Sequence, residues 1–453
     1  MSLTIFSKPF LARRGMMGFF MDYRAKLRRV SPDDYKRLRR FDMERRPYKQ
    51  WHILRPLTWL LSFPSVWKRR LRVHKRDMEK IKPPFILLCN HMAFIDFKVT
   101  TAALFPWRSN YVVAIDGFIG REGLLRFAGG ILKRRVTSDV FLIRHLRTIL
   151  HQHKNVVSIY PEARYSLIGV PAYIPPSLGK LLKRFKLPVV MLRMHGNYLS
   201  SPVWNLRQRK TPIEAELFRL FTPEDLLGMD TGEIHQGIRR AFEYDEYAWQ
   251  RDRGIHITEE FRAEGLHHVI YRCPACETEF AMRSRGSILE CGHCGKQWRM
   301  TSLGQMEALD GPTEFSHLPD WYQYQVEQVR REIEAGRYRF EDEVRVESLV
   351  NNRGYYFAGN ARVVHDNTGF TLQGDPAYFS EIVHKSVRSM YSCHIEYDYF
   401  GKGDCFELST MNDTYYLYPL NKVNVVTKIL IATEELHQLA QRKESARVVI
   451  QPE

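Results

Sequence analysis

Short apolar runs alternate with segments of helical periodicity between residues 81 and 210, and this alternation constrains the fold more than any other feature of the chain. The apolar runs, which have the length and the Val, Ile and Leu content of buried strands, are residues 85–89, 110–115, 155–160 and 187–194. The neighbouring segments predict helices at 97–106, 121–133, 138–153 and 177–186. Strands that alternate with helices predict an α/β fold, here a mixed, largely parallel sheet flanked by helices.

In such sheets, functional groups gather beyond the carboxyl ends of the strands, so the residues that follow each apolar run carry the most information. The first run is followed at once by His91 and, five positions later, by Asp96. A histidine oriented by a carboxylate is a competent general base for a hydroxyl group. The spacing alone is common, and an Asp near a helix start is often a cap. Cys89, inside the same run, is expected to be a small buried apolar residue rather than a nucleophile.

Three further blocks follow His91 and Asp96 in order. Residues 129–135 begin with two glycines and end in Arg134 and Arg135, residues 161–166 read Pro-Glu-Ala-Arg-Tyr-Ser, and Leu187-Pro188 opens the last strand. In order and spacing, the set resembles the glycerolipid acyltransferase family, which includes the lysophosphatidic acid acyltransferases. The resemblance covers roughly residues 50–240. The blocks of that family are N-H-x4-D, a Gly-led stretch ending in Arg, F-P-E-G-T-R-S and a Val-Pro-type strand.

The resemblance implies that His91 takes the proton from a glycerol hydroxyl as the hydroxyl attacks an acyl thioester, with Asp96 fixing the imidazole. It also implies a phosphate-bearing acceptor held by Arg135 and Arg164, with Glu162 and Ser166 in the same site. The first block is complete, and Arg135 fits the second block best, with Arg134 one register away as the alternative. The third block keeps Pro161, Glu162 and Ser166, but Ala163, Arg164 and Tyr165 stand where the family has Gly, Thr and Arg, so the arginine is displaced by one residue.

The implied reaction transfers a fatty acyl group from acyl-CoA or acyl carrier protein to a lysophospholipid such as 1-acyl-glycerol-3-phosphate. The product would be phosphatidic acid or a related glycerolipid. A different class of function stays open, which is a non-catalytic lipid- or nucleic-acid-binding adaptor. The four ordered blocks favour the enzyme, because they are harder to produce by chance than an excess of charge.

The charge distribution predicts an anionic partner for the N-terminal half. The net charge is +17, but residues 1–210 hold 42 Lys and Arg against 12 Asp and Glu, whereas residues 211–453 hold 26 against 39. The apolar, tryptophan-containing segment 51–67 is followed by a basic cluster at 68–76. This pattern predicts that residues 1–80 form a basic amphipathic region that contacts an anionic membrane surface. The alternative is a helix packed on its own domain.

No apolar run is long enough to cross a bilayer, and nothing at the N-terminus resembles a signal peptide. The sequence therefore predicts a cytoplasmic protein that binds the membrane peripherally.

Four of the seven cysteines form two C-x2-C pairs separated by fourteen residues, Cys273 with Cys276 and Cys291 with Cys294. Four thiolates at this spacing predict a structural Zn²⁺ in a zinc ribbon over residues 266–305, the alternatives being two disulfides or a redox pair. His293 lies inside the second pair and is not expected to be a ligand. The surrounding chain is acidic, which argues against nucleic acid as the partner of the ribbon.

The remaining segments complete the expected domain organisation. The acyltransferase-like domain is expected at 81–250. One helix is expected at its end, at 223–249, and another just beyond it, at 258–265. A further helix is expected at 321–335. Short alternating strands fill residues 340–425, and a helix is expected at 424–442. An antiparallel β domain at 335–445 closed by one helix resembles the pleckstrin-homology-like architecture.

Overall fold

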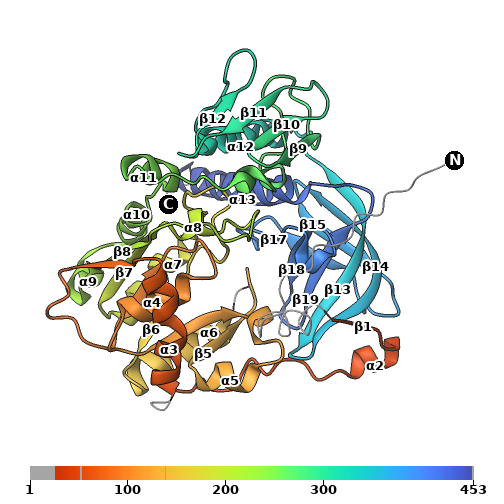
Figure 1. Ribbon diagram of the computed structural model, residues 1–453. Coiled ribbons are helices and arrows are strands. Elements are labelled where there is room, and N and C mark those ends of the chain that lie inside the picture. The colour runs from red at the N-terminus through yellow and green to blue at the C-terminus, as the bar shows by residue number, and fades with distance from the viewer. Residues whose placement is uncertain (1–25, 51–53, 138, 451–453) are drawn as a thin grey trace.

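The computed structural model describes residues 26–50, 54–137 and 139–450. Residues 1–25 of the predicted membrane-contact region and Trp51, at the start of its apolar segment, lie outside the described residues. Over the described ranges the strands form three sheets, of seven, four and eight strands. Figure 1 shows the four-stranded sheet at the top, the seven-stranded sheet at the lower left and the eight-stranded sheet at the right.

The seven-stranded sheet has the order β2-β8-β7-β3-β6-β4-β5. Its strands are β2 (Arg72–Arg76), β3 (Ile86–Cys89), β4 (Ser109–Ala114), β5 (Gly130–Lys133), β6 (Val156–Ile159), β7 (Val189–His195) and β8 (Glu214–Phe221). The five strands from β7 to β5 run parallel, whereas β8 is antiparallel to β7 and pairs in parallel with β2. The α/β prediction is therefore confirmed. The prediction of a largely parallel sheet is matched only in part, because β2 and β8 run in the opposite direction to the other five strands.

Apolar side chains fill both faces of this sheet because each central strand alternates its residues between them. In β3, Ile86 and Leu88 belong to one buried cluster, whereas Leu87 and Cys89 belong to another on the opposite face. The first cluster includes Leu146 of the helix that precedes β6, and the second includes Val66. Helices therefore cover β3 on both faces of the sheet, as its continuous apolar run predicts.

Helices surround the sheet largely where the sequence predicts them. They are α3 (Leu54–Lys68), α4 (Asp96–Ala103), η1 (Ile115–Phe118), α5 (Glu122–Phe127), α6 (Val140–Arg147), η2 (Thr148–Gln152), α7 (Ser177–Phe185), α8 (Asn197–Ser200), α9 (Pro223–Gly228), α10 (Thr231–Ala241) and α11 (Glu246–Asp252). The helix predicted at 223–249 is three helices, because Thr222, Asp230 and Asp245 each cap a new start with their side chains.

The helix predicted at 121–133 is wrong in its second half, where residues 130–133 form β5. Gly129 has a φ of +91°, a left-handed conformation that ends the helix. A Cβ on Gly130 would lie 2.9 Å from the carbonyl oxygen of Leu125, so the chain turns back close to α5. The apolar residues that follow then pair with β4 instead of continuing the helix.

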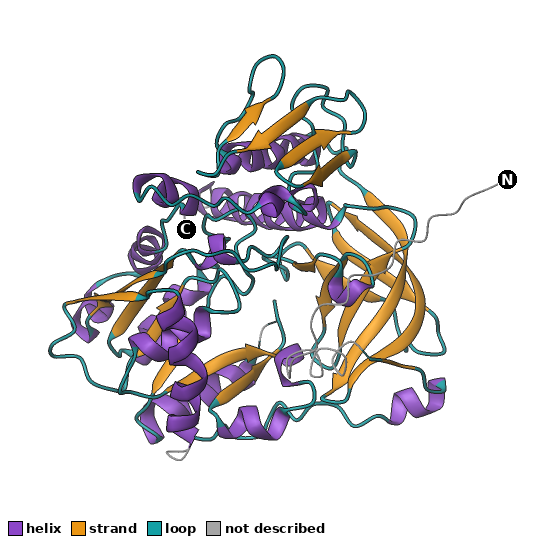
Figure 2. Ribbon diagram, viewed as in Figure 1, coloured by secondary structure: helices purple, strands orange, loops and turns teal. Residues whose placement is uncertain are grey.

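The four-stranded sheet carries the two cysteine pairs near its start. It consists of β9 (Met282–Arg285), β10 (Ile288–Cys291), β11 (Gln297–Met300) and β12 (Met306–Ala308), all antiparallel, and follows η3 (Glu260–Ala263) and η4 (Leu266–His268). The next helix, α12 (Leu318–Glu334), packs along α13 (Val426–Ile450). In Figure 2 these two helices lie directly below the four-stranded sheet.

The eight-stranded sheet has the order β16-β15-β14-β13-β19-β18-β17, with β1 paired to β14. Its strands are β1 (Leu27–Arg28), β13 (Phe340–Asn351), β14 (Gly354–Asp366), β15 (Gly369–Gly374), β16 (Val383–Ser386), β17 (His394–Glu396), β18 (Cys405–Ser409) and β19 (Thr414–Pro419), with η5 (Tyr399–Gly401) before β18. The pairs from β13 to β19 are antiparallel, as predicted for this region, and α13 follows them.

Part of the basic N-terminal region lies against this sheet. β1 pairs with β14, and the short helix α2 (Pro32–Arg37) follows it. Arg40 forms an ion pair of 3.1 Å with Asp413, and the Phe41 amide donates to the carbonyl of Val350. None of the described helices is both long and apolar enough to cross a membrane.

One buried cluster runs through all four predicted regions of the chain and includes Tyr35 of the N-terminal region. It contains Tyr198 of α8, Trp298 of β11 and Phe406 of β18. The seven-stranded sheet with its helices, the cysteine-bearing sheet and the C-terminal sheet therefore share a continuous apolar core. The residue boundaries expected for the separate domains stay a prediction.

Candidate active site and metal centre

His91 and Asp96 lie at the carboxyl end of β3, on the turn that leads into α4. Nδ1 of His91 is 2.9 Å from Oδ2 of Asp96. The same oxygen accepts hydrogen bonds from the amides of Met92 (2.7 Å) and Ala93 (3.1 Å). Asp96 thus orients the histidine and fixes the backbone of the turn before α4 at the same time. It does not cap α4, whose N-cap residue is Ile95 and whose start has no side-chain cap.

Asn197 completes the environment of Asp96. Its Nδ2 donates a hydrogen bond of 2.7 Å to Oδ1 of Asp96, and both side chains are buried. Asn197 starts α8, just after β7, the strand that pairs with β3. Reasoning from the sequence missed this residue, although its place after a buried strand was the available signal.

Asn90 fixes the end of β3 against the same neighbouring strand. Its Nδ2 donates to the carbonyl of Met194, and its Oδ1 accepts from the Met194 amide, both at 2.9 Å. The Asn90 side chain therefore extends the hydrogen bonding between β3 and β7 by one residue. It holds the turn that carries His91 in register with the turn that carries Asn197.

Glu162 supports His91 from the backbone side. Its Oε2 accepts the His91 amide at 2.7 Å, and its Oε1 accepts the Ala172 amide and the Tyr244 hydroxyl. Burial raises the pKa of Glu162 to about 7, because the opposing effect of these hydrogen bonds is smaller. Both carboxylate oxygens already have protein donors, so the structure places Glu162 as a support of the His91 turn.

Ser166 closes the same turn. Its amide donates to the carbonyl of His91 at 2.8 Å, and its hydroxyl donates to the carbonyl of Val170. His91, Asp96, Glu162 and Ser166 thus belong to one hydrogen-bonded group, which joins the ends of β3 and β6.

Two tyrosine rings pack on the imidazole of His91. The ring centroids of Tyr160 and Tyr165 lie 4.5 Å and 4.3 Å from that of His91. Tyr165 stands where the resembled family has arginine. Ala163, which replaces a glycine of the same block, has a φ of +56°, the left-handed conformation that favours glycine. The chain therefore keeps the turn geometry of a glycine at a cost of about 1 kcal/mol.

The arginines expected to bind phosphate are each held by a glutamate of the C-terminal sequence, and Arg135 is also held by Asp116. Arg135 contacts Glu407 at 2.8 Å and Asp116 at 3.1 Å. Arg164 contacts Glu434 at 3.1 Å. Burial alone would lower the pKa of each arginine, but the neighbouring carboxylates outweigh it and raise both. The structure does not bring these guanidinium groups into the hydrogen-bonded group around His91.

Arg134, the alternative for the second block, is also buried. Its Nη2 donates to the carbonyl of Asn412, in the turn between β18 and β19. Burial lowers the pKa of Arg134. Cys89 is buried inside β3, and burial raises the pKa of its thiol, which agrees with its interpretation as a small apolar residue.

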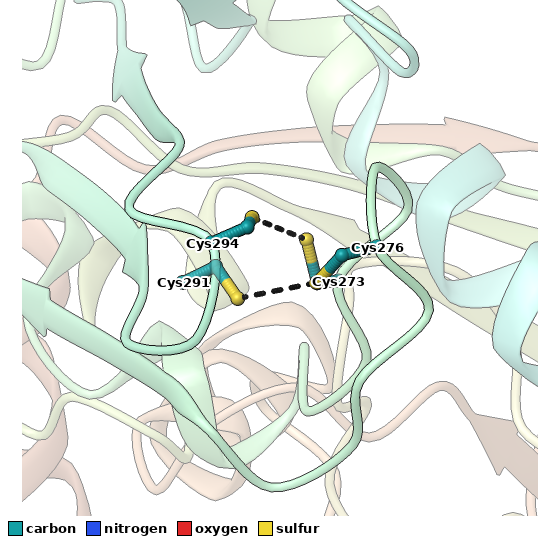
Figure 3. Close-up of side chains that lie close together, drawn as sticks. All are labelled: Cys273, Cys276, Cys291 and Cys294. Atoms are coloured by element: carbon teal, nitrogen blue, oxygen red, sulfur yellow. Dashed lines mark hydrogen bonds between the residues drawn. The ribbon is translucent and has the colours of Figure 1, made fainter.

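The four cysteines form a compact cluster between two turns, with their side chains directed toward one another (Figure 3). Sγ of Cys273 lies 3.8 Å from that of Cys294, and Sγ of Cys276 lies 3.7 Å from that of Cys291. A tetrahedral Zn²⁺ with Zn–S distances of about 2.3 Å requires sulfur atoms about 3.8 Å apart. A disulfide would require about 2.05 Å. The four-cysteine cluster therefore fits a metal such as zinc, and its sulfur spacing excludes disulfides in this structure.

No protein-family model matches the chain, and no curated protein matches it. Among solved structures, the chain is similar to the crystal structure of the 1-acyl-sn-glycerophosphate (LPA) acyltransferase PlsC from Thermotoga maritima, with 14% sequence identity and a TM-score of 0.32. The alignment covers 42% of this chain and 78% of that chain. A TM-score this low does not establish a common fold, so the function has to be inferred from the residues of the site.

Proposed function

We propose that this protein is a membrane-associated O-acyltransferase that moves a fatty acyl group from a thioester donor to the free hydroxyl of a lysophospholipid. The proposed acceptor is 1-acyl-glycerol-3-phosphate or a close relative, which would give phosphatidic acid or a related glycerolipid. The observation that carries the proposal is the His91–Asp96 pair, held at the carboxyl end of a parallel strand by Asn197 and Glu162.

The proposed chemistry uses His91 as the base. Asp96 engages Nδ1, so Nε2 on the opposite side of the ring takes the proton of the acceptor hydroxyl. The hydroxyl oxygen attacks the thioester carbonyl carbon, the carbon–sulfur bond breaks, and the leaving thiolate takes the proton from the imidazolium. General base catalysis of this kind contributes about 10²–10⁴-fold.

No acyl-enzyme is required, and Cys89 is not placed to form one. Its thiol is buried in β3, and a raised pKa keeps it protonated. The direct route leaves His91 as the group that both accepts the hydroxyl proton and returns it to the thiolate.

In this proposal Arg135 and Arg164 recognise the acceptor phosphate, for which a guanidinium fork is a suitable donor. Both are the arginines of the resembled blocks, and Arg135 is favoured over Arg134. The acyl donor is acyl-CoA or acyl carrier protein.

An exposed apolar surface supports membrane contact. On α3, Leu57, Leu60, Leu61 and Trp67 are exposed. α3 packs on α4, beside which Phe94 and Phe97 are also exposed, three and six residues after His91. The exposed basic side chains at the end of α3 and after it are Lys68, Arg70, Arg72, Lys75 and Arg76. This combination suits an anionic bilayer that presents the lipid substrate to His91.

Cys273, Cys276, Cys291 and Cys294 would hold a structural Zn²⁺. The ion would link the turn before β9 to the turn between β10 and β11 and supply folding free energy, with no part in acyl transfer.

Purified protein supplied with an acyl thioester and a lysophospholipid in mixed micelles tests the proposal. The expected result is release of free thiol together with an equal amount of diacylated product. Tight, salt-dependent binding of RNA or vesicles without acyl transfer would contradict it and support the adaptor function instead.

A further inference from the structure

The two arginines of the proposed phosphate site are already bound by glutamates from far along the chain. Nη1 of Arg135 donates to Glu407 of β18 at 2.8 Å, and Nη2 of Arg164 donates to Glu434 of α13 at 3.1 Å. Asp116 adds a second carboxylate beside Arg135. β18 and α13 of the C-terminal sequence thus each place one carboxylate in the proposed phosphate site.

The glutamates are held in place by their own surroundings. Oε1 of Glu407 accepts the hydroxyl of Ser409 at 2.7 Å, and Oε1 of Glu434 accepts the hydroxyl of Ser392 at 2.6 Å. Glu407 is buried and Glu434 is largely buried. Each carboxylate is therefore pre-oriented by a serine, Ser409 on β18 itself and Ser392 just before β17, and forms a charge-assisted hydrogen bond that is little screened by water.

Carboxylates and phosphates are alternative ligands for the same guanidinium donors. Arg135 faces two carboxylates, so its charge is more than balanced before any substrate arrives. A phosphate could bind there only by displacing a glutamate, since adding a third anion would leave a buried excess of negative charge. Nε of Arg164 is buried, and within the described residues it has no hydrogen-bond partner, so one donor of this guanidinium is not used by Glu434.

We propose that Glu407 and Glu434 determine acceptor specificity by competing, as internal anions, with the acceptor phosphate for Arg135 and Arg164. The inference rests on the proposed acyl transfer to a glycerol hydroxyl. The two glutamates thereby weaken the binding of phosphate-bearing acceptors and leave the binding of uncharged acceptors unaffected. The glutamates do not touch His91, so they act on acceptor binding and not on the chemical step.

The test compares two acceptors that share the reacting glycerol hydroxyl, 1-acyl-glycerol-3-phosphate and the uncharged 1-monoacylglycerol. Glu407→Gln and Glu434→Gln keep the size of each side chain and one carbonyl acceptor, but remove the charge. For the phosphate-bearing acceptor we expect the KM to fall by about tenfold or more, the usual effect of one charge-assisted hydrogen bond. The KM for monoacylglycerol and the kcat for both acceptors should be unchanged.

Glu435→Gln is the matched control. Glu435 lies next to Glu434 on α13 but pairs with Arg330 of α12 at 2.6 Å and not with either arginine of the proposed site. Its substitution should leave the KM of both acceptors unchanged. If the two test variants change the KM of both acceptors equally, or of neither, the competition does not exist and the arginines are structural.

A binding measurement keeps the inference separate from the proposed activity. Calorimetry with glycerol 3-phosphate on His91→Ala, with and without the two Glu→Gln substitutions, should show binding tightened by the substitutions. This binding measurement shows whether the glutamates compete with phosphate even if the wild-type protein transfers no acyl group. If the Gln variants fail to fold, Ser409→Ala and Ser392→Ala, which only release the glutamates, should tighten binding in the same direction. No tightening in any folded variant overturns the proposal.

Discussion

Asn197 donates a hydrogen bond of 2.7 Å to Oδ1 of Asp96, the carboxylate oxygen that does not contact His91. Asp96 is thereby fixed from both sides, with His91 and two backbone amides on Oδ2 and a buried amide on Oδ1. In the proposed reaction the position of this carboxylate decides the orientation of the base. Asn197 is therefore a positioning residue in this proposal, although it lies 101 residues away along the chain.

Replacing Asn197 with Ala should lower kcat by about tenfold with little change in the KM for the acyl donor. A buried carboxylate oxygen without a donor costs about 1–3 kcal/mol, which the site relieves by letting Asp96 move. Steady-state kinetics over a range of pH measures both effects. Asn205→Ala is the control, because the buried Asn205 side chain donates a part-buried hydrogen bond of 2.8 Å to the carbonyl of Phe261, outside the site. Equal losses in the two variants would contradict the positioning role.

Substitution of the proposed base should remove acyl transfer without unfolding the protein. His91→Ala should lower kcat/KM by at least about 100-fold, the lower end of what a general base contributes. Asp96→Asn should do nearly the same, since the Asn197 amide can turn its oxygen toward the new amide group while the imidazolium loses its counter-charge.

His195 provides a matched control for His91. Its Nδ1 lies 3.0 Å from Glu246, a second histidine–carboxylate pair at the end of the adjacent strand β7. His195→Gln should retain most of the activity. Turnover that persists in folded His91→Ala protein, or that disappears equally in both variants, would refute the assignment of the base.

Much of the seven-stranded sheet could be predicted because its signals are local. The apolar runs that became β3, β4, β6 and β7 are continuous, and His91 and Asp96 lie within one turn of each other. β5 was missed because its four residues have no periodicity of their own and depend on pairing with β4. β2 and β8 were missed because charged residues interrupt their apolar pattern.

The partners of the site could not be predicted, because they come from distant parts of the chain. Asn197 reaches Asp96 only through the pairing of β3 with β7. Glu407 and Glu434 reach their arginines across 272 and 270 residues, through the packing of the C-terminal sheet and α13. A motif can identify an arginine as a candidate phosphate ligand, but it carries no information on which internal anion the fold brings to it.

Glu162→Gln should change how stability depends on pH. The Glu162 carboxyl has a pKa of about 7 in the folded protein and about 4.5 in the unfolded chain. Between these values the folded state holds the proton that the unfolded state has lost, so the free energy of unfolding falls as pH rises from about 4.5 to about 7 and is level above. The full fall is on the order of 3 kcal/mol.

Urea unfolding of wild-type and Glu162→Gln protein at pH 5 and pH 8 measures this effect. Relative to wild type, the free energy of unfolding of the variant should be higher at pH 8 than at pH 5, because glutamine has no proton to release. Parallel curves for Glu162→Gln and wild type would show that Glu162 does not titrate in this range.

The four-cysteine cluster should carry close to one zinc ion per chain. Cys273→Ser and Cys294→Ser should lose the metal and lower the melting temperature, because binding free energy of a structural zinc is folding free energy. His293→Ala is the control and should retain both, since His293 is exposed and outside the four-cysteine cluster. Metal analysis and thermal unfolding measure the outcome. Protein without metal and without free thiols would support disulfides instead.

The exposed face of α3 should bind anionic vesicles. Leu60 and Trp67 are each 70% exposed and Leu61 is 61% exposed, whereas Trp59 and Phe63 pack against Phe105. At about 1 kcal/mol for each basic residue near an anionic surface, three engaged side chains strengthen binding roughly 100-fold. This attraction decays over about 8 Å at physiological salt, whereas apolar insertion does not depend on salt in that way. Vesicles of mixed anionic composition should therefore bind the protein more strongly than zwitterionic ones, with partial release by salt.

Replacing Leu60, Leu61 and Trp67 together with Ser should release the protein from anionic vesicles even at low salt, with the fold intact. The side chains are exposed, so their loss removes little of the core, and the remaining basic residues supply only the salt-sensitive part of binding. Val423→Ser is the control, because Val423 is 71% exposed but lies beyond β19, far along the chain from α3. Co-sedimentation at two salt concentrations separates the two contributions. If the triple variant binds vesicles as strongly as the wild type, the attraction is due to charge alone. If the wild type does not bind, α3 is an element packed on α4 without a membrane role.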